Sequence, residues 1–165
     1  MKNTLLCGLA ALGLAATAAP APAQEVIVGL GYSDFSLGNA IDSAAIELEY
    51  QSAPFYSVGN LSVSWGAVLG TDLEGDAFVG AGIVNKYNFD DRWFAELSLM
   101  PGAYFEGPAV NDLGDTLEFR TLLGLGYTLK NNAALSLAFV HKSNAGISTT
   151  NPGVNTVLLR YHYRF

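Results

Sequence analysis

Low charge, a single cysteine and the lack of a long apolar run after residue 23 set this sequence apart from ordinary soluble domains. Charged residues make up 14% of the chain and hydrophobic residues 50%, whereas a soluble domain usually carries about 25% charged residues. A membrane-spanning helix needs roughly 20 apolar residues in succession, and no such run follows residue 23. A closed β-barrel is the other structure that satisfies every backbone polar group inside lipid. The composition therefore favours a membrane β-barrel.

Two function classes are excluded by what is missing. The single cysteine, Cys7, lies in the N-terminal apolar run, so the rest of the chain has neither a disulfide framework nor thiol chemistry. The formal net charge is −7, whereas nucleic-acid-binding domains carry a basic patch. We therefore expect no nucleic-acid partner. The length suits one domain.

The N-terminus has the pattern of a signal peptide. Lys2 supplies a positive charge, and residues 5–19 form an apolar run of about 15 residues, which is short for the alternative, a membrane anchor. Ala21-Pro22-Ala23 then offers the small residues that signal peptidase requires. We expect residues 1–23 to be a signal peptide, removed to leave residues 24–165 as the exported domain.

Apolar residues alternate with small or polar residues in eight segments of this domain. In residues 61–67, for example, leucine, valine, tryptophan and alanine alternate with serine and glycine. Alternation with a period of two predicts strands, and segments of about ten residues suit strands that cross a bilayer at a tilt. Turn-rich connections separate the segments, so we predict an all-β fold, an eight-stranded antiparallel up-and-down transmembrane β-barrel. The segments cover approximately residues 26–33, 46–50, 61–69, 79–83, 93–99, 117–127, 135–139 and 157–165.

The two faces of these segments differ in polarity. One face is aliphatic and aromatic, and the other combines glycine and serine with charged residues. An eight-stranded barrel has an interior just wide enough for side chains, so we expect the charges to pair inside it without a pore. The alternative, a soluble sandwich or lipocalin-like barrel, would turn the aliphatic face inward and carry more charge outside. The charged residues are Glu47, Glu49, Glu96, Glu118, Arg120, Arg160 and Arg164.

Signatures of a cofactor or a metal are weak. Three Gly-x-Gly pairs lie within predicted strands and no helix pattern follows them, whereas a phosphate loop requires a strand, a turn and a helix. The two histidines, His141 and His162, have opposite strand parity, which argues against a shared metal site. We predict neither a cofactor nor a metal.

His141 points most directly to chemistry. It has the parity of Leu137 and Phe139, which are expected to face lipid, and a polar group there costs free energy unless it has a partner. Ser143 follows on the same face, and Asn155, just before the last segment, has the parity of Val157 and Leu159 on the outer face. These residue types can serve as general base, nucleophile and orienting group. The alternative is a histidine of the interfacial belt, at the depth of the lipid headgroups.

The side of the membrane can also be predicted. In bacterial outer-membrane barrels the short turns are periplasmic and the longer loops extracellular, so the connection between the last two strands would face the outer leaflet, where lipopolysaccharide lies. The chain ends with Phe165 after alternating aromatic residues. This ending resembles the signal read by the outer-membrane assembly machinery, which we expect as a partner.

A resemblance to a known family rests on the last two segments and the loop between them. The residues that carry it are His141-Lys142-Ser143-Asn144-Ala145-Gly146-Ile147 and Asn151-Pro152-Gly153-Val154-Asn155. Together with the barrel pattern and the aromatic C-terminus, they resemble the lipid A 3-O-deacylase family, called PagL. The resemblance implies an outer-membrane esterase that removes the 3-O-linked 3-hydroxyacyl chain from lipid A of lipopolysaccharide, without a cofactor. It leaves a homodimer open.

The resemblance also implies a role for individual residues. Ser143 would be the nucleophile, and His141 the general base and then the general acid. The main-chain amide of Gly146, with Asn144 or Asn151, would supply the oxyanion hole. Hydrogen bonds to the developing oxyanion are often the largest single contribution to catalysis.

Asn155 departs from the family pattern, because a glutamate is expected at this position. Its amide oxygen can accept a hydrogen bond from the His141 ring and fix the tautomer, but it cannot stabilise an imidazolium as a carboxylate does. In trypsin the change from aspartate to asparagine costs about 10⁴ in turnover. Three interpretations therefore stay open: an active lipid A deacylase, a catalytically silent or adhesin-type structural barrel, and a phospholipase A-like esterase.

Overall fold

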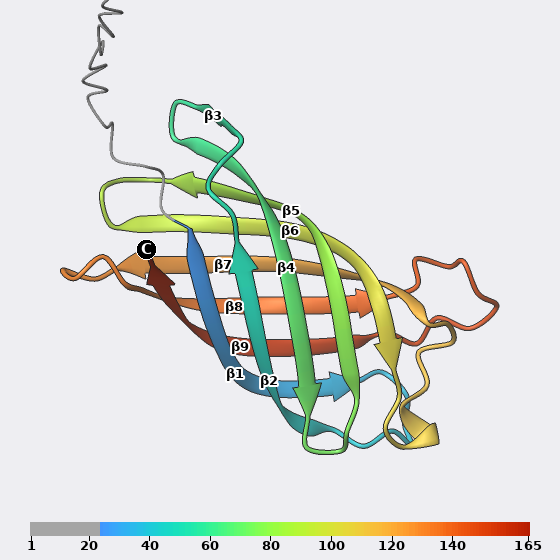
Figure 1. Ribbon diagram of the computed structural model, residues 1–165. Coiled ribbons are helices and arrows are strands. Elements are labelled where there is room, and N and C mark those ends of the chain that lie inside the picture. The colour runs from blue at the N-terminus through green and yellow to red at the C-terminus, as the bar shows by residue number, and fades with distance from the viewer. Residues whose placement is uncertain (1–23) are drawn as a thin grey trace, which may run out of the picture.

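The computed structural model describes residues 24–165, which form a closed antiparallel β-barrel (Figure 1). Each barrel strand pairs with the next along the chain, and pairing of β1 with β9 closes the sheet. The predicted eight-stranded fold is confirmed. The elements are β1 (Glu25–Phe35), β2 (Ser43–Gln51), β3 (Tyr56–Val58), β4 (Leu61–Asp72), β5 (Ala77–Asn88), β6 (Trp93–Phe105), the 3-10 helix η1 (Ala109–Asn111), β7 (Leu117–Thr128), β8 (Ala134–Ser143) and β9 (Val154–Arg164).

β3 is a short ninth strand that the sequence pattern did not predict. Residues 52–60 were expected to be a turn, but Tyr56–Val58 pairs with the start of β4 over three residues. Because β2 pairs with β4 from Gly66 onward, β3 lengthens one hairpin beyond the barrel (Figure 1). The hairpin is too short to show a clear period of two, which explains why its alternation was missed.

The barrel has two unlike ends. The connections 36–42, 73–76, 106–116 and 144–153 lie at one end, at the right and bottom of Figure 1, which we call the loop end. The connections 52–60, 89–92 and 129–133 lie at the other end, together with Gln24 and Phe165, which exchange backbone hydrogen bonds of 3.0 Å. We call this the terminal end. The predicted signal peptide, residues 1–23, lies outside the described residues.

The outward face of the barrel is apolar, as the sequence predicts. Leu30, Leu137 and Leu159, for example, are each about 60% exposed, and exposed and buried residues alternate along β1, β8 and β9. A surface of this kind suits lipid, because a soluble protein rarely exposes so continuous an apolar area. Within residues 24–165, no helix has the length and hydropathy that a membrane span requires.

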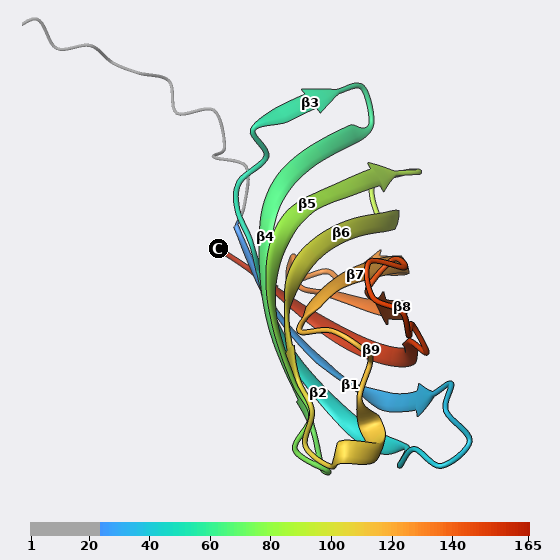
Figure 2. The ribbon, with the colours of Figure 1, turned by 90° about the vertical axis from the view of Figure 1, so that its right-hand side faces the viewer.

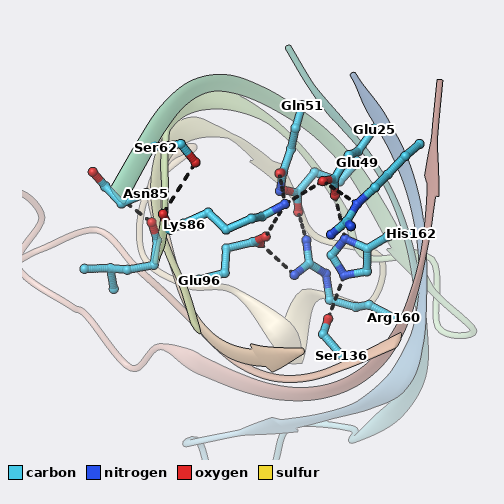
Figure 3. A network of polar contacts seen from close by, with 12 residues as sticks. Glu25, Glu49, Gln51, Ser62, Asn85, Lys86, Glu96, Ser136, Arg160 and His162 are labelled. Atoms are coloured by element: carbon cyan, nitrogen blue, oxygen red, sulfur yellow. Dashed lines mark hydrogen bonds and ion pairs between the residues drawn. The ribbon is translucent and has the colours of Figure 1, made fainter. Parts of the chain in front are cut away.

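Ion pairs fill the middle of the barrel interior, which confirms most of the predicted pairing. Arg160 donates to Glu96 at 2.7 Å and to Glu49 at 2.9 Å (Figure 3). Arg120 donates to Glu47 at 2.6 Å, and all of these side chains are at most 5% exposed. These ion pairs link four strands, β2, β6, β7 and β9. Removing one partner of such a buried pair would leave an uncompensated charge and destabilise the barrel.

The network continues toward the terminal end, where Lys86 lies 3.6 Å from Glu96. Glu25 accepts hydrogen bonds from Lys86 at 2.7 Å and from Arg164 at 3.0 Å. Its other oxygen is 2.8 Å from Nδ1 of His162, whose Nε2 is 2.8 Å from the Ser136 hydroxyl (Figure 3). The parity prediction for His162 is therefore confirmed, since the ring lies inside the barrel and is 0% exposed.

Glu118 is the exception to the predicted pairing. It is fully buried, and neither carboxylate oxygen has a hydrogen-bond partner among residues 24–165. Arg120 points to the same side of β7 but is already bonded to Glu47 and Glu49. The sequence could place Glu118 on the inner face, but it could not show how the cations are shared.

The connections at the loop end are hydrogen-bonded to one another and cover the barrel mouth. Asn111 of η1 accepts from the Ile41 amide at 2.8 Å and donates to Asp76 at 2.5 Å, so one side chain joins three connections. Figures 1 and 2 show η1 beside the β1–β2 connection. Leu113, which is 0% exposed, packs below it in an apolar cluster that includes Phe78. The catalytic candidates therefore lie at the edge of connections that are hydrogen-bonded to one another.

Candidate active site

His141 and Asn155 form a hydrogen-bonded pair on the outer face of the barrel at the loop end. They are register partners on β8 and β9, and Nδ1 of His141 lies 2.8 Å from Oδ1 of Asn155. Both side chains are half-buried, and the residues before and after each of them turn inward or are buried. The polar residues that the strand parity placed together are thus in contact.

This contact fixes the position of the ring proton. An amide oxygen accepts but cannot donate, so Nδ1 of His141 must carry the proton that Asn155 accepts. The other ring nitrogen, Nε2, then has a free lone pair. In this tautomer His141 is ready to take a proton from a hydroxyl group.

Ser143 lies two residues beyond His141 on the same face of β8. It pairs with Phe119 of β7, and its side chain is half-buried. Two residues of a strand advance about 6.6 Å, so the two side chains are neighbours along the strand. The structure records no hydrogen bond between Ser143 and His141; in enzymes without bound substrate such contacts are often long and tighten only in the reactive complex.

Gly153 fits closely against the His141 ring. A Cβ atom at this position would lie 3.0 Å from Cε1 of His141 and 3.2 Å from the Lys142 carbonyl oxygen. Its φ of +71° is also one that residues with side chains rarely adopt. A larger residue would therefore require the His141 ring or the Lys142 carbonyl to shift by a few tenths of an ångström. The sequence motif alone gave no sign of this contact.

Asn144 organises the loop that follows Ser143. Its side chain is fully buried; Nδ2 donates to the Leu113 carbonyl at 3.0 Å and to the Thr150 carbonyl at 2.7 Å. Residues 144–147 form a tight turn closed by a 3.1 Å hydrogen bond from the Ile147 amide to the Asn144 carbonyl. Ala145 at φ +56° and Gly146 at φ +77° are both left-handed in this turn, as a type I′ turn requires.

The three expected oxyanion-hole residues differ in whether their N–H groups are already used in hydrogen bonds. The Gly146 amide donates to Oδ1 of Asn144 at 3.0 Å, and both protons of the Asn144 side-chain amide are used as described above. Asn151 accepts from the Asn144 main-chain amide at 3.0 Å through Oδ1. Its Nδ2 makes no recorded hydrogen bond to residues 24–165, so it is the side-chain donor of the three that stays free.

An apolar groove begins next to the His141–Asn155 pair and runs toward the terminal end. Phe139, two residues before His141, pairs with Leu123 on one side and Val157 on the other. All three side chains are about half exposed or more. Small residues form the floor, which leaves room for a linear hydrocarbon chain. The lining is Ala95, Leu123, Gly124, Leu125, Leu137, Ala138, Phe139 and Val157.

One acidic residue beside the site was not singled out by sequence reasoning. Asp34 near the end of β1 is the register partner of Asn155 on the side opposite His141. Its position depends on how the first and last strands close the barrel, which strand patterns alone do not give. Within the described part of the chain, no cluster of three or more potential ligands could hold a metal ion.

The sequence matches the profile of the family described as lipid A 3-O-deacylase (PagL) over residues 34–164. The chain belongs to this family. The resemblance carried by the His141–Asn155 motif is therefore confirmed, and the barrel is an outer-membrane protein. No curated protein matches the sequence.

Solved structures agree with this assignment at the level of the fold. The chain is similar to the crystal structure of the outer membrane enzyme PagL, with a TM-score of 0.64, 20% identity, and coverage of 84% of this chain and 97% of that one. It is also similar to a de novo designed transmembrane β-barrel (TM-score 0.58, 14% identity, 87% and 96% covered). A third similar structure is Neisserial surface protein A (TM-score 0.53, 14% identity, 87% and 96% covered).

Proposed function

We propose that this outer-membrane barrel is an active esterase that removes the 3-O-linked 3-hydroxyacyl chain from lipid A. The observation that carries the proposal is the 2.8 Å contact between His141 and Asn155 on the outer face, with Ser143 beside it. A structural barrel has no need for a hydrogen-bonded histidine facing lipid, where an unpaired polar group is costly. Membership of the lipid A 3-O-deacylase family supports this choice of reaction.

In the proposed first step, Ser143 attacks the ester carbonyl carbon. Nε2 of His141 takes the hydroxyl proton as the new bond forms, and then delivers it to the oxygen at position 3 of the sugar as the ester bond breaks. The product alcohol leaves, and the 3-hydroxyacyl group stays on Ser143. Water, deprotonated by the same nitrogen, then releases the fatty acid and restores the hydroxyl group.

Asn155 supports this cycle by orienting His141. Its oxygen keeps the proton on Nδ1, so the productive tautomer is populated before the substrate arrives. The change to asparagine is costly in trypsin because the wrong tautomer forms. Here the atom of Asn155 that lies 2.8 Å from Nδ1 is the oxygen Oδ1, which favours the productive tautomer. We therefore expect activity without a carboxylate in direct contact with the ring.

Asn151 is our first candidate for the oxyanion hole. The Asn144 amide holds Oδ1 of Asn151, so Nδ2 is free to donate to the developing negative charge. The Gly146 amide would have to leave its bond to Asn144 before it could contribute. Loss of one such donor typically lowers turnover by about 10²–10³, so Asn151→Ala provides a direct test.

The apolar groove suits the acyl part of the substrate. It starts one residue pair from the His141–Asn155 pair and follows β7 and β8 toward the membrane interior. An acyl chain in it would extend along the barrel wall as it does in the lipid leaflet. The loop end would then lie in the outer leaflet, at the depth of the lipid A sugar.

The experiment is expression of the full chain in a host whose lipid A carries ester-linked 3-hydroxyacyl chains, followed by mass spectrometry of the lipid A. We expect a loss of mass equal to one 3-hydroxyacyl group. Ser143→Ala should abolish the loss, whereas Ser148→Ala, a serine of the same loop, should keep it. Folding of each variant is checked by the altered gel mobility of the unheated barrel.

Three other results would reject parts of the proposal. Full activity of Ser143→Ala would exclude Ser143 as the nucleophile. Unchanged lipid A in cells that contain the folded barrel would favour the catalytically silent or adhesin-type interpretation. Release of fatty acid from radiolabelled glycerophospholipid, with lipid A intact, would favour a phospholipase A-like esterase.

A further inference from the structure

The side of Asn155 that faces away from His141 is occupied by an acidic residue. Asp34 pairs with Asn155 in the β1–β9 ladder, and Asn155 pairs with His141 in the β8–β9 ladder. All three residues point outward, so Asp34, Asn155 and His141 form one row across three strands. Cross-strand neighbours have Cβ atoms about 4.5–5.5 Å apart, which is within reach of two short polar side chains.

The hydrogen-bonding groups in this row are complementary. Oδ1 of Asn155 is bonded to His141, so its two Nδ2 protons remain to donate. Asp34 is exposed, and its carboxylate makes no recorded side-chain hydrogen bond to residues 24–165. A carboxylate accepts hydrogen bonds and cannot donate when ionised, so an Asn155 amide between the two residues has one favourable orientation.

We propose that Asp34 is a positioning residue that, by accepting a hydrogen bond from Nδ2 of Asn155, holds the amide oxygen toward His141. This inference rests on the proposed esterase activity, because it adds a fourth member to the Ser143, His141 and Asn155 set. The negative charge expected at the family's glutamate is then supplied one strand further away. Asp34 would act on the His141 ring through the orientation of the Asn155 amide.

Backbone contacts keep the row in register. The amide of Ser36, two residues beyond Asp34, donates to the Gly153 carbonyl at 3.2 Å, and Gly153 is the residue packed against the His141 ring. The end of β1 is thus fixed to the same loop that borders the site. Asp34 cannot shift by one residue without breaking this contact.

The outward neighbours of His141 give no competing charge. Thr121 of β7 and Asn155 of β9 flank it in the row, and Phe119 and Val157 lie in the adjacent rows. Lys142 and Arg120 point to the interior side of the wall. Among Thr121, His141, Asn155 and Asp34, Asp34 is therefore the one that carries a full charge. A second carboxylate, Asp42, accepts a hydrogen bond from the Phe35 amide at 3.0 Å and lies on the side of Asp34 away from Asn155.

The first test compares turnover of three variants with that of the wild type, each as the full-length, membrane-inserted protein. Asp34→Asn should lower kcat about tenfold to a hundredfold, the rate equivalent of one hydrogen bond to a charged group, with little change in KM. Asp34→Glu should recover part of the loss. Glu74→Gln, which removes an exposed carboxylate at the same end, serves as the matched control and should be unchanged.

A rescue experiment separates positioning from a general charge effect. Asn155→Glu places a carboxylate directly against His141, so Asp34→Asn should have no further effect in that background. Equal losses in the two backgrounds would overturn the proposal.

The second test does not depend on lipid A hydrolysis. With ¹⁵N-labelled histidine the refolded protein gives ring signals from two residues, His141 and His162. In the wild type at neutral pH we expect His141 to be the Nδ1–H tautomer, and in Asp34→Asn to be a mixture, with His162 unchanged as the internal reference. Unchanged His141 signals would reject the role of Asp34. A tautomer change in a protein that leaves lipid A intact would instead reject the proposed function alone.

Discussion

The barrel contains two sets of serine, histidine and a third polar residue. One set is completely hydrogen-bonded but buried, and the other is accessible but incompletely hydrogen-bonded. Inside the barrel, Ser136, His162 and Glu25 are joined by two contacts of 2.8 Å. This inner set has a carboxylate and complete hydrogen bonding. Its histidine is 0% exposed, so no ester could reach it.

The outer set is incompletely hydrogen-bonded but accessible. His141 contacts Asn155, a neutral amide, and Ser143 is not yet hydrogen-bonded to the ring. The set lies at the edge of an apolar groove, in the plane where a lipid substrate would be. Hydrogen-bond geometry of the triad type therefore occurs in a buried structural network as well as in a candidate active site. Whether a substrate can reach the histidine is what distinguishes the two.

The largest expected effect comes from removing each histidine in turn. His141→Ala should lower deacylation by about 10²–10⁴, the usual contribution of general acid–base catalysis, without loss of folding. His162→Ala should leave folded molecules active but destabilise them by about 1–3 kcal/mol, because Glu25 and Ser136 lose a buried partner. Lipid A mass spectra and urea unfolding of the refolded protein measure the two effects. The reverse pattern would show that the inner set is the catalytic one.

The second effect tests the carboxylate of the inner set. Glu25→Gln gives that set an amide, as Asn155 does for the outer set, and it removes the shared partner of Lys86 and Arg164. We expect a loss of about 3 kcal/mol, at the low end for a broken buried ion pair, because Lys86 keeps its contact with Gln51. Urea unfolding provides the measurement. A change in deacylation by correctly folded molecules would contradict the purely structural role.

A third, smaller effect concerns the fit around His141. Gly153→Ala should cost about 1–2 kcal/mol of stability from the left-handed backbone, and its Cβ should displace the ring and lower activity about tenfold or more. Gly59→Ala is a matched control, since Gly59 has a φ of +56° and open space around it. It should show similar strain with normal activity. Equal activity in the two variants would mean that the ring tolerates the added methyl group.

The smallest effect lies outside both sets, in the turn 89–92 at the terminal end. Backbone amides of Trp93 and Arg92 donate to Asp90 and hold the pKa of its carboxyl group below the usual value. A lowered pKa means that this contribution to stability is present above the unfolded value of about 4 and is lost as the pH falls through the folded value. Asp90→Asn should remove this pH dependence, measured as the shift of the urea midpoint between neutral and acidic solution. An unaltered shift would assign it to other carboxylates.

Much of the barrel could be predicted because strands with one face in lipid and one inside must alternate. That rule placed His141 outside and His162 inside, and both placements are confirmed. It failed for β3, whose three residues are too few to show a period. It also could not show that Glu118 is left without a cation, because ion-pair partners come from strands distant in the sequence.

The site was predictable to the extent that it is local. His141 and Ser143 are two residues apart on one strand, so their shared face follows from the sequence. The role of Asn144 as a link to Leu113 and the position of Asp34 beside Asn155 depend on contacts between distant parts of the chain. These contacts are set by loop packing and by barrel closure, which a single strand pattern does not contain.

The outward position of Ser143 and His141 has a consequence for how an enzyme of this design would be measured. Its substrate would arrive from within a two-dimensional sheet, so its saturation would follow the mole fraction of lipid A among the surrounding lipids. Added detergent or phospholipid would then slow the reaction by dilution within the surface, even at constant bulk concentration. Rates compared between micelles and membranes would have to be scaled to that surface fraction.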